Sequence, residues 1–360
     1  MKKNILMWMA VAAGIMFPRM AGACTGITLK SSDGATVLAR TIEWGGSDLN
    51  SRYVVVPRGY EQQAYVTGGQ KAGMKFTARY GYVGVAVELE DFVAEGLNEA
   101  GLSAGLFYFP NYGGYETYDP AKGETSISDL QLVPWMLAGF KTVDEVKEAI
   151  RGIHVVSSDP RASTAHWRIA DASGRQVVLE IVDGKPCFYE NPLGVLTNSP
   201  GFEWQLTNLN NYVNLFPGGA EKKQLGGVTL SAFGAGSGFL GIPGDVTPPS
   251  RFVRAAFYQA SSPVQATARK TVLQAFQILN NFDIPVGIEF PDGKVPADIP
   301  SATQWTSATD VRNLVFYYRT MWNSAIRSID LKAIDFSKVK YRSAPVDEVK
   351  EQPIVPLALR

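Results

Sequence analysis

The sequence contains few cysteines and histidines, the residues that form disulfides and the nitrogen and sulfur ligands of metals. Its 360 residues include only two cysteines, Cys24 and Cys187, and two histidines, His154 and His166. Neither histidine has a partner at metal-ligand spacing, so the sequence does not support a histidine-rich metal site. His166 lies within a predicted strand, where we expect a hydrogen-bonded core residue.

The chain also lacks a net charge and, beyond its first residues, a long apolar run. Its 34 basic and 34 acidic residues cancel, and no polybasic stretch occurs. This balance argues against a nucleic-acid footprint and against a basic membrane-binding patch. No later apolar stretch approaches the roughly 20 residues that a membrane-spanning helix needs. We therefore expect no nucleic-acid partner and no membrane insertion.

The N-terminal segment has the pattern of an export signal. Two lysines follow the initiator methionine, an apolar run occupies residues 5–17, and Ala21 and Ala23 form an A-x-A cleavage site. The pattern predicts that residues 1–23 are a signal peptide that is removed. Residues 24–360 contain no repeat or low-complexity linker, so we expect a single mature domain in the periplasm or outside the cell.

Cleavage after Ala23 would make Cys24 the first residue of the mature chain. That residue would then carry a thiol and a free α-amine. The ordinary pKa of the amine, roughly 7.7–8.0, lies close to that of the thiol, about 8.5, so one group can deprotonate the other near neutral pH. Nucleophile and base would come from one residue, and Cys24 is therefore a candidate N-terminal nucleophile.

Other interpretations of Cys24 stay open on local grounds. It could be the lipid-modified cysteine of a surface lipoprotein, although Ala21 stands at position −3, where leucine is usual, and the thioether would consume the sulfur. It could form a disulfide with Cys187 in an oxidising compartment, which would silence the nucleophile. It could also be an ordinary small buried residue.

The predicted elements alternate groups of strands with pairs of helices. Strands are predicted between residues 26 and 109, helices over 130–140 and 142–150, strands again between 165 and 200, helices over 247–260 and 264–281, and closing strands over 304–310 and 311–318, followed by a polar tail. This order lacks βαβ alternation and predicts an α+β fold of two antiparallel sheets packed face to face with helices outside. The first hairpin, turning at Asp33-Gly34, would bring Arg40 back beside Cys24.

Amide hydrolysis by a cysteine needs a positive charge near the thiolate and donors for the oxyanion. Arg40 is the candidate for the charge, Glu43 for orienting the α-amine, and Asn198 for the oxyanion. Arg251 stands at the start of a predicted helix, where the helix dipole disfavours a cation, and this suggests a partner outside the helix. Blander interpretations are an ion pair of Arg40 with Glu43, a turn-forming asparagine and a surface arginine.

Several aromatic residues lie near these candidates in sequence. Trp44, Phe107 and Tyr108, with Phe109 and Tyr112, would either fill the core or form a pocket for the acyl group of a substrate. We take Trp44, Phe107 and Tyr108 as candidate substrate-binding residues.

These stretches together resemble the choloylglycine hydrolase family of N-terminal-nucleophile hydrolases, which includes bile salt hydrolases and penicillin V acylases. The matching motifs are Cys24-Thr25-Gly26-Ile27-Thr28-Leu29, Ala39-Arg40, Gly96-Leu97-Asn98-Glu99-Ala100-Gly101-Leu102, Gly194-Val195-Leu196-Thr197-Asn198-Ser199-Pro200, Leu240-Gly241-Ile242-Pro243-Gly244-Asp245 and Thr247-Pro248-Pro249-Ser250-Arg251-Phe252. The resemblance implies a four-layer αββα sandwich, often a homotetramer, with no metal or organic cofactor. It also implies that Cys24 is the nucleophile, that Arg40 and Arg251 tune its thiol and amine, and that Asn198 helps to build the oxyanion hole.

The chain departs from the family pattern at two positions. Glu43 stands where the family usually has aspartate, and Tyr108 stands where bile salt hydrolases carry an asparagine, which resembles the penicillin V acylase pattern. The resemblance thus predicts an exported amidase for small-molecule acyl amides, with penicillin V first, N-acyl homoserine lactones second and conjugated bile salts third. An alternative of a different class is a lipid-anchored surface protein that binds an amphiphile without turnover.

Overall fold

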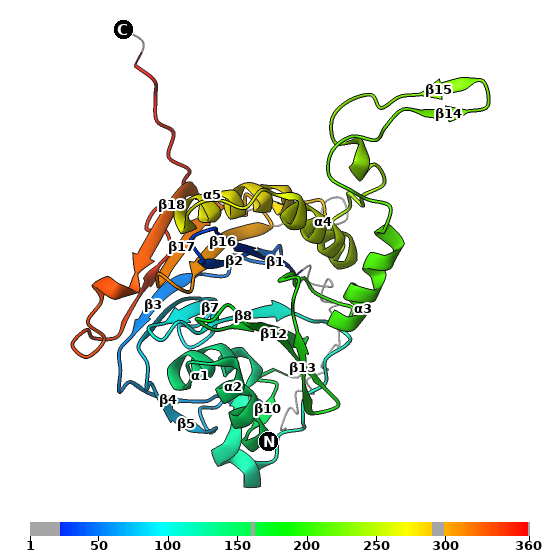
Figure 1. Ribbon diagram of the computed structural model, residues 1–360. Coiled ribbons are helices and arrows are strands. Elements are labelled where there is room, and N and C mark those ends of the chain that lie inside the picture. Colours follow the sequence, from blue (N-terminus) through cyan, green and yellow to red (C-terminus); the bar gives the residue numbers. More distant parts are fainter. Residues whose placement is uncertain (1–21, 160–162, 290–298, 359–360) are drawn as a thin grey trace, which may run out of the picture.

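Two antiparallel sheets lie face to face, with helices on both outer sides (Figure 1). The structure, a computed structural model, describes residues 22–159, 163–289 and 299–358. The predicted signal peptide falls outside these residues, apart from its last two. The expected α+β sandwich with the layer order αββα is confirmed.

The first sheet has five strands and contains Cys24. Its order is β1 (Gly22–Lys30), β2 (Thr36–Trp44), β16 (Thr303–Asp310), β17 (Val315–Thr320) and β18 (Asn323–Asp330). Strands β1 and β2 are buried along nearly their whole length because α-helices cover one face and the second sheet covers the other. The turn between them uses Gly34 at a φ of 84°, which a glycine adopts without strain.

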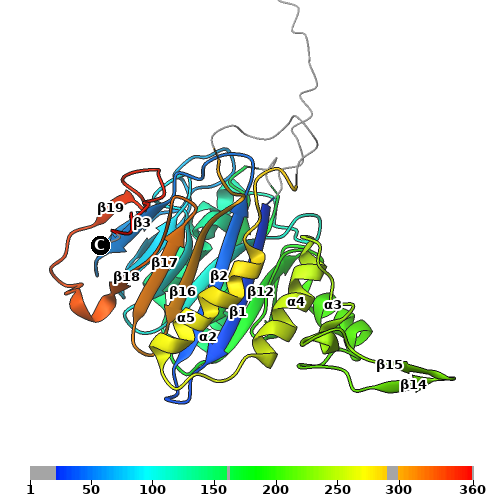
Figure 2. The same cartoon turned by 90° about the horizontal axis from the view of Figure 1, so that it is seen from above.

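The second sheet has eight strands, all paired antiparallel. Its order is β13 (Lys185–Glu190), β12 (Gln176–Val182), β11 (Ala165–Ala170), β8 (Ser103–Tyr108), β7 (Val93–Asn98), β6 (Tyr82–Ala86), β3 (Arg52–Val56) and β19 (Arg342–Pro345). Three two-stranded pairs complete the strands: β4 (Glu61–Gln63) with β5 (Lys75–Thr77), β9 (Ser126–Ser128) with β10 (His154–Val156), and β14 (Lys223–Leu225) with β15 (Val228–Leu230). The last pair forms a hairpin that projects from the body of the molecule (Figure 2).

Two pairs of helices cover the sheets. Helices α4 (Pro248–Ser261) and α5 (Ala268–Leu279) pack on β1, β2 and β16, whereas α1 (Leu132–Gly139) packs on β7 and β8, with α2 (Val143–Ala149) beside it. Helix α2 begins as predicted, because the Thr142 side chain accepts a hydrogen bond from the Glu145 backbone N–H at 3.2 Å. A short fifth helix, α3 (Phe202–Asn208), follows the second group of strands and was not predicted.

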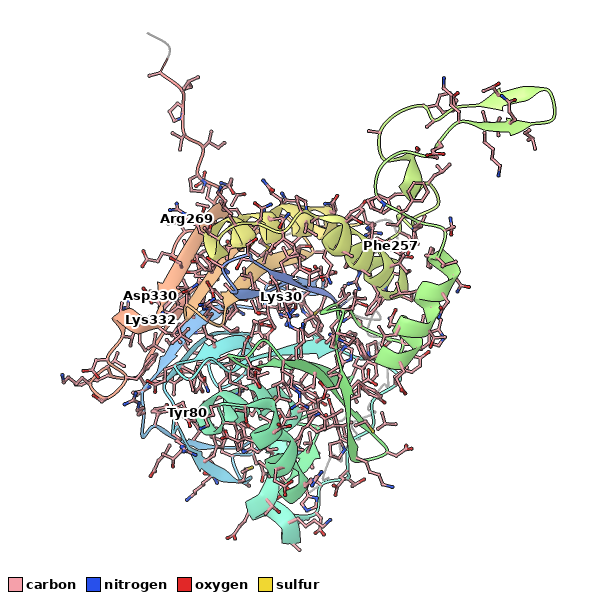
Figure 3. All side chains as sticks on the ribbon, viewed as in Figure 1. Lys30, Tyr80, Phe257, Arg269, Asp330 and Lys332 are labelled. Atoms are coloured by element: carbon pink, nitrogen blue, oxygen red, sulfur yellow. The ribbon has the colours of Figure 1, made fainter. Side chains whose placement is uncertain are left out.

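The layers enclose two apolar cores. One lies between the sheets and extends under α4 and α5, and the other lies between the eight-stranded sheet and α1 with α2. Side chains fill the space between the layers, while charged groups such as Lys30, Arg269 and Lys332 lie on the surface (Figure 3). None of the helices in the described part of the chain has the length and apolar content needed to cross a bilayer.

The predicted strand over 304–310 is confirmed as β16, but the prediction for the residues that follow it was wrong in part. Residues 311–314 form a turn, with Leu314 at a φ of 61°, and β17 begins only at Val315. The expected polar tail instead contains β18 and β19. Strand β18 lies at the edge of its sheet and is mostly exposed, so it lacks the apolar alternation by which strands are recognised. The predicted strand around residue 196 is a single bridge from Leu196 to Gly26.

Candidate active site

Cys24 lies inside the molecule, at the point where β1 enters the sandwich. Cys24 is 3% exposed, and its Sγ accepts a hydrogen bond from Arg40 Nη2 at 2.7 Å. The hairpin register pairs Cys24 with Ile42 and Gly26 with Arg40, so Cys24 and Arg40 are diagonal neighbours on one face of the sheet. The predicted approach of Arg40 to Cys24 is therefore present.

Opposing effects act on the thiol. Burial raises the pKa of Cys24 and is the largest effect, while the positive charge of Arg40 lowers it. Glu43 raises the same pKa, and a backbone hydrogen bond from Tyr108 and the charge of Arg251 lower it. Desolvation thus favours the neutral thiol, whereas the charges of Arg40 and Arg251 favour the thiolate.

Asn198 and Arg251 hold the backbone of Cys24. Asn198 Oδ1 accepts hydrogen bonds from the Cys24 backbone N–H at 2.8 Å and from Arg251 Nη2 at 2.7 Å. Arg251 Nη1 donates to the Cys24 carbonyl and, at 2.8 Å, to Thr25 Oγ1. Arg251 is completely buried at the first turn of α4, so its partners do lie outside its own helix. Asn198 Nδ2 donates to the Tyr108 carbonyl at 2.6 Å.

Glu43 is buried beside the residue that precedes Cys24. Its cross-strand partner is Ala23, and it is 1% exposed. Burial raises the pKa of Glu43 to about 7, although the charges of Arg251 and Arg40 act in the opposite direction. Among the described residues, neither of its carboxylate oxygens accepts a well-formed hydrogen bond. The alternative of an Arg40–Glu43 ion pair is not formed, because Arg40 instead pairs with Glu95 at 3.6 Å.

The three candidate aromatic residues occupy two different places. Trp44 and Tyr108 meet edge to face with ring centroids 6.3 Å apart, and both rings lie against Gly22. Phe107 is completely buried, and the Arg40 guanidinium lies 4.0 Å from the centre of its ring. The structure therefore places Trp44 and Tyr108 beside the start of β1, whereas Phe107 supports Arg40 and presents no surface to a ligand.

The remaining cysteine and histidine expectations can be compared with the structure. Cys24 and Cys187 are both free, so the disulfide left open by the sequence is not formed. His166 is a completely buried core residue, as expected, with Nε2 donating to the Thr197 carbonyl at 3.0 Å. Within the described residues, no group of three histidine, cysteine, aspartate or glutamate side chains is arranged to hold a metal.

Two charged residues next to this site were missed from the sequence. Glu95 on β7 and Arg168 on β11 are each 1% exposed and pair with each other at 3.3 Å. A charged residue inside an otherwise apolar strand was the available signal, because ionised side chains are rarely buried without a partner.

The fold and the groups around Cys24 define the class: this is an N-terminal-nucleophile hydrolase fold, with a buried cysteine near the start of the first strand. The family described as "Linear amide C-N hydrolases, choloylglycine hydrolase family" matches residues 24–343. The chain therefore belongs to the choloylglycine hydrolase family and is a hydrolase that acts on carbon–nitrogen bonds in linear amides. The matched region begins at Cys24.

The relatives include bile salt hydrolases and a penicillin V acylase. The bile salt hydrolase/transferase of Clostridium perfringens is 33% identical over 325 residues, which cover 88% of this chain and 95% of that protein. The penicillin V acylase of Pectobacterium atrosepticum is 25% identical over 335 residues, which cover 86% of this chain and 81% of that protein.

The fold is also that of solved relatives. The crystal structure of an arginine-to-leucine variant of the conjugated bile acid hydrolase from Clostridium perfringens has a TM-score of 0.80 at 30% identity, covering 93% of this chain and 100% of that chain. A second structure of that hydrolase carries a cysteine-to-alanine change sixteen positions before that arginine, and Arg40 likewise follows Cys24 by sixteen positions.

Proposed function

We propose that Cys24, freed by cleavage of the Ala23–Cys24 bond during export, is the nucleophile of a cysteine amidase. The observation that carries this proposal is the convergence of three side chains on one residue. Arg40 binds the sulfur of Cys24, Asn198 binds its nitrogen, and Arg251 binds its carbonyl oxygen. Any buried residue of an edge strand needs partners for its backbone groups, but a structural cysteine does not need a buried arginine on its sulfur, whereas a nucleophile must be held in one orientation.

Cleavage turns the Cys24 nitrogen into an amine that can accept the thiol proton. The thiolate then attacks the amide carbonyl, and the carbonyl electrons move onto its oxygen. Asn198 Nδ2 uses one hydrogen on the Tyr108 carbonyl, which leaves its second hydrogen for this oxyanion. When the tetrahedral species collapses, the carbon–nitrogen bond breaks and the leaving amine takes the proton from the α-ammonium. Water then hydrolyses the thioester and restores the thiol.

Glu43 is suited to bind the ammonium form of the Cys24 amine. Its buried carboxylate lies opposite Ala23, and the Thr41 side chain interacts with it without forming a well-aligned hydrogen bond, so an ammonium would add the donor that this carboxylate lacks. A positive amine at this place would supply that donor and would also lower the pKa of Glu43.

The geometry favours this proposal over a lipid-anchored binding protein. The sulfur of Cys24 lies between the two sheets and accepts a hydrogen bond from a buried arginine. A diacylglyceryl thioether would need a path to the surface for its chains and would remove the thiolate that Arg40 stabilises.

For the substrate we now place conjugated bile salts first, because relatives named as bile salt hydrolases are the more similar ones. Penicillin V is the second candidate. It is favoured by Tyr108 and by the edge-to-face pair that this residue forms with Trp44, which can pack against a phenoxyacetyl ring. Acyl homoserine lactones stay a prediction from the sequence without further support.

The test combines mass spectrometry with kinetics. Exported protein should begin at Cys24 with an unmodified thiol, and Cys24→Ser should abolish turnover while Cys187→Ser retains it. Values of kcat/KM are then compared for a glycine-conjugated bile salt, penicillin V and a long-chain acyl homoserine lactone. Turnover by Cys24→Ser, or a lipid on Cys24 in active protein, would contradict the proposed mechanism.

A further inference from the structure

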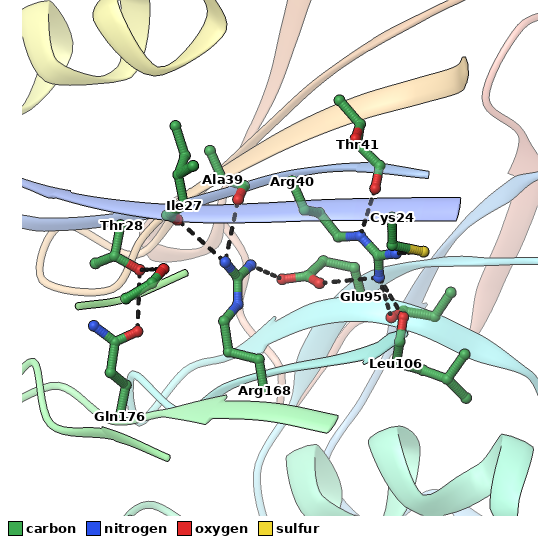
Figure 4. Close-up of polar contacts among 12 residues, drawn as sticks. Cys24, Ile27, Thr28, Ala39, Arg40, Thr41, Glu95, Leu106, Arg168 and Gln176 are labelled. Atoms are coloured by element: carbon green, nitrogen blue, oxygen red, sulfur yellow. Dashed lines mark hydrogen bonds and ion pairs between the residues drawn. The ribbon is translucent and has the colours of Figure 1, made fainter. Parts of the chain in front are cut away.

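Two arginines cross the space between the sheets in opposite directions (Figure 4). Arg40 extends from β2 to the carbonyls of Ala94 and Leu106, on the eight-stranded sheet, while its Nη2 reaches Cys24. Arg168 extends from the eight-stranded sheet to the carbonyls of Ile27 and Ala39 on the other sheet, both at 3.1 Å. Each guanidinium thus fastens one sheet to the other.

One carboxylate lies between the two guanidinium groups. Glu95 Oε1 is 3.3 Å from Arg168 Nη2, and Glu95 Oε2 is 3.6 Å from Arg40 Nη1. The Phe107 ring lies under both arginines, at 4.0 Å from the Arg40 guanidinium and 5.5 Å from that of Arg168. A net charge of +1 therefore remains on this buried group of three, next to the thiol.

Two glycines provide the space that this arrangement needs. A Cβ on Gly105, the cross-strand partner of Glu95, would lie 1.9 Å from Glu95 Oε2. A Cβ on Gly26 would lie 2.9 Å from Arg168 Nη1 and 2.9 Å from the Phe107 ring. The backbone at both positions is thus adapted to these buried charges.

We propose that Glu95 and Arg168 are positioning residues that hold Arg40 against Cys24 and set the positive potential at its thiol. This inference rests on the proposed function, in which the Cys24 thiolate is the nucleophile. Glu95 anchors Arg40 on the side away from the sulfur, and Arg168 prevents Glu95 from neutralising Arg40 fully. The charged groups that face the thiol are Arg40 and Glu43 from β2 and Arg251 from α4, with Glu95 and Arg168 behind Arg40.

The alternative is that the two residues only clamp the sheets together. The two explanations predict different changes in the pKa of the Cys24 thiol when Glu95 and Arg168 are replaced. Glu95→Gln keeps a side-chain oxygen that can still accept from Arg40 but removes the negative charge, so the pKa of the Cys24 thiol should fall by about one unit. Arg168→Met removes a positive charge and should raise the pKa of the same thiol by about one unit. A clamp alone would lower stability in both variants without opposite shifts.

The experiment measures the pH dependence of Cys24 alkylation by iodoacetamide, in mature protein that also carries Cys187→Ser. The acidic limb of kcat/KM is measured in parallel and should move in the same two directions. Asp129→Asn, which alters a buried carboxyl outside the site, is the matched control and should leave the limb in place. Gly105→Ala, which displaces the Glu95 carboxylate, should lower the turnover rate several-fold. Arg168→Lys keeps the positive charge, so the acidic limb of kcat/KM should stay at the wild-type pH.

This inference would be overturned if the acidic limb of kcat/KM stayed at the wild-type pH in Glu95→Gln and Arg168→Met, or if it shifted in the same direction in both variants. Should either variant fail to fold, the pH profiles of Gly105→Ala and Arg168→Lys decide. A shifted acidic limb in Gly105→Ala together with an unshifted one in Arg168→Lys supports the proposal, and an unshifted limb in Gly105→Ala contradicts it. Failure of the proposed function is seen separately, as turnover in Cys24→Ser.

Discussion

Replacement of Arg40 by glutamine removes the positive charge closest to the proposed nucleophile and leaves a shorter, neutral polar side chain. Arg40 Nη2 lies 2.7 Å from Cys24 Sγ, and neither residue is more than 3% exposed. Solvent therefore screens this interaction weakly, and the loss should be felt by the thiolate much more than by the neutral thiol.

The size of the effect follows from the separation of the charges. Two unit charges about 4 Å apart at an effective dielectric constant of about 20 interact by roughly 4 kcal/mol. This corresponds to about three pKa units, and we expect a rise of about two to three for the pKa of the Cys24 thiol. At neutral pH the thiolate population, and with it kcat/KM, should fall about 100-fold to 1000-fold.

The assay follows the alkylation rate of Cys24 against pH in Cys187→Ser protein, together with kcat/KM for one amide substrate. Arg40→Lys is the matched control, since it keeps the charge and loses the planar fork, so it should recover much of the thiol pKa but less of the turnover rate. An alkylation midpoint in Arg40→Gln that coincides with the wild-type midpoint would refute the assignment of Arg40 as the stabiliser of the thiolate.

Three further predictions concern other parts of the molecule. Burial raises the pKa of Glu43 from 4.5 to about 7, so between these pH values the folded chain that retains Ala23 holds a proton that the unfolded chain releases. The free energy of unfolding, measured by urea titration, should therefore decrease as the pH rises from about 4.5 to about 7. In Glu43→Gln this decrease should be smaller. Phe107→Leu should lower kcat with little change in KM, because the Phe107 ring supports Arg40. Trp44→Ala should mainly raise KM for aromatic acyl amides. The reverse pattern would indicate that Phe107, and not Trp44, contacts the acyl group. Light scattering of the purified protein should give four times the mass of the mature chain, and a monomer mass would contradict the expected homotetramer.

The sequence allowed the core of the site to be predicted where the chemistry is local or carried by a recognisable motif. The Asp33-Gly34 turn determines the register of the first hairpin, and this register alone brings Arg40 to Cys24. Local patterns marked Asn198 and Arg251 as candidates, and the resemblance to a known family then connected these distant residues to Cys24.

Other parts depend on contacts between distant strands and could not be predicted. Glu95 and Arg168 are separated by 73 residues and meet only because β7 and β11 lie on either side of β8. The role of Phe107 is another case, because its position in sequence does not show whether the ring faces a ligand or a guanidinium. Strand β18 escaped prediction since an exposed edge strand carries little apolar alternation.

Strand β1 begins two residues before Cys24, and this has a consequence for the order of events after synthesis. Gly22 and Ala23 contribute two of the nine paired positions between β1 and β2, and Gly22 fills the space beside Trp44 and Tyr108. In the uncleaved chain, Gly22 therefore lies against the two aromatic residues that we propose as part of the acyl-binding site. Under the proposed cleavage after Ala23, loss of Gly22 and Ala23 would clear the space beside Trp44 and Tyr108 in the same step that creates the α-amine of Cys24, so the nucleophile and the room for an acyl group would arise together.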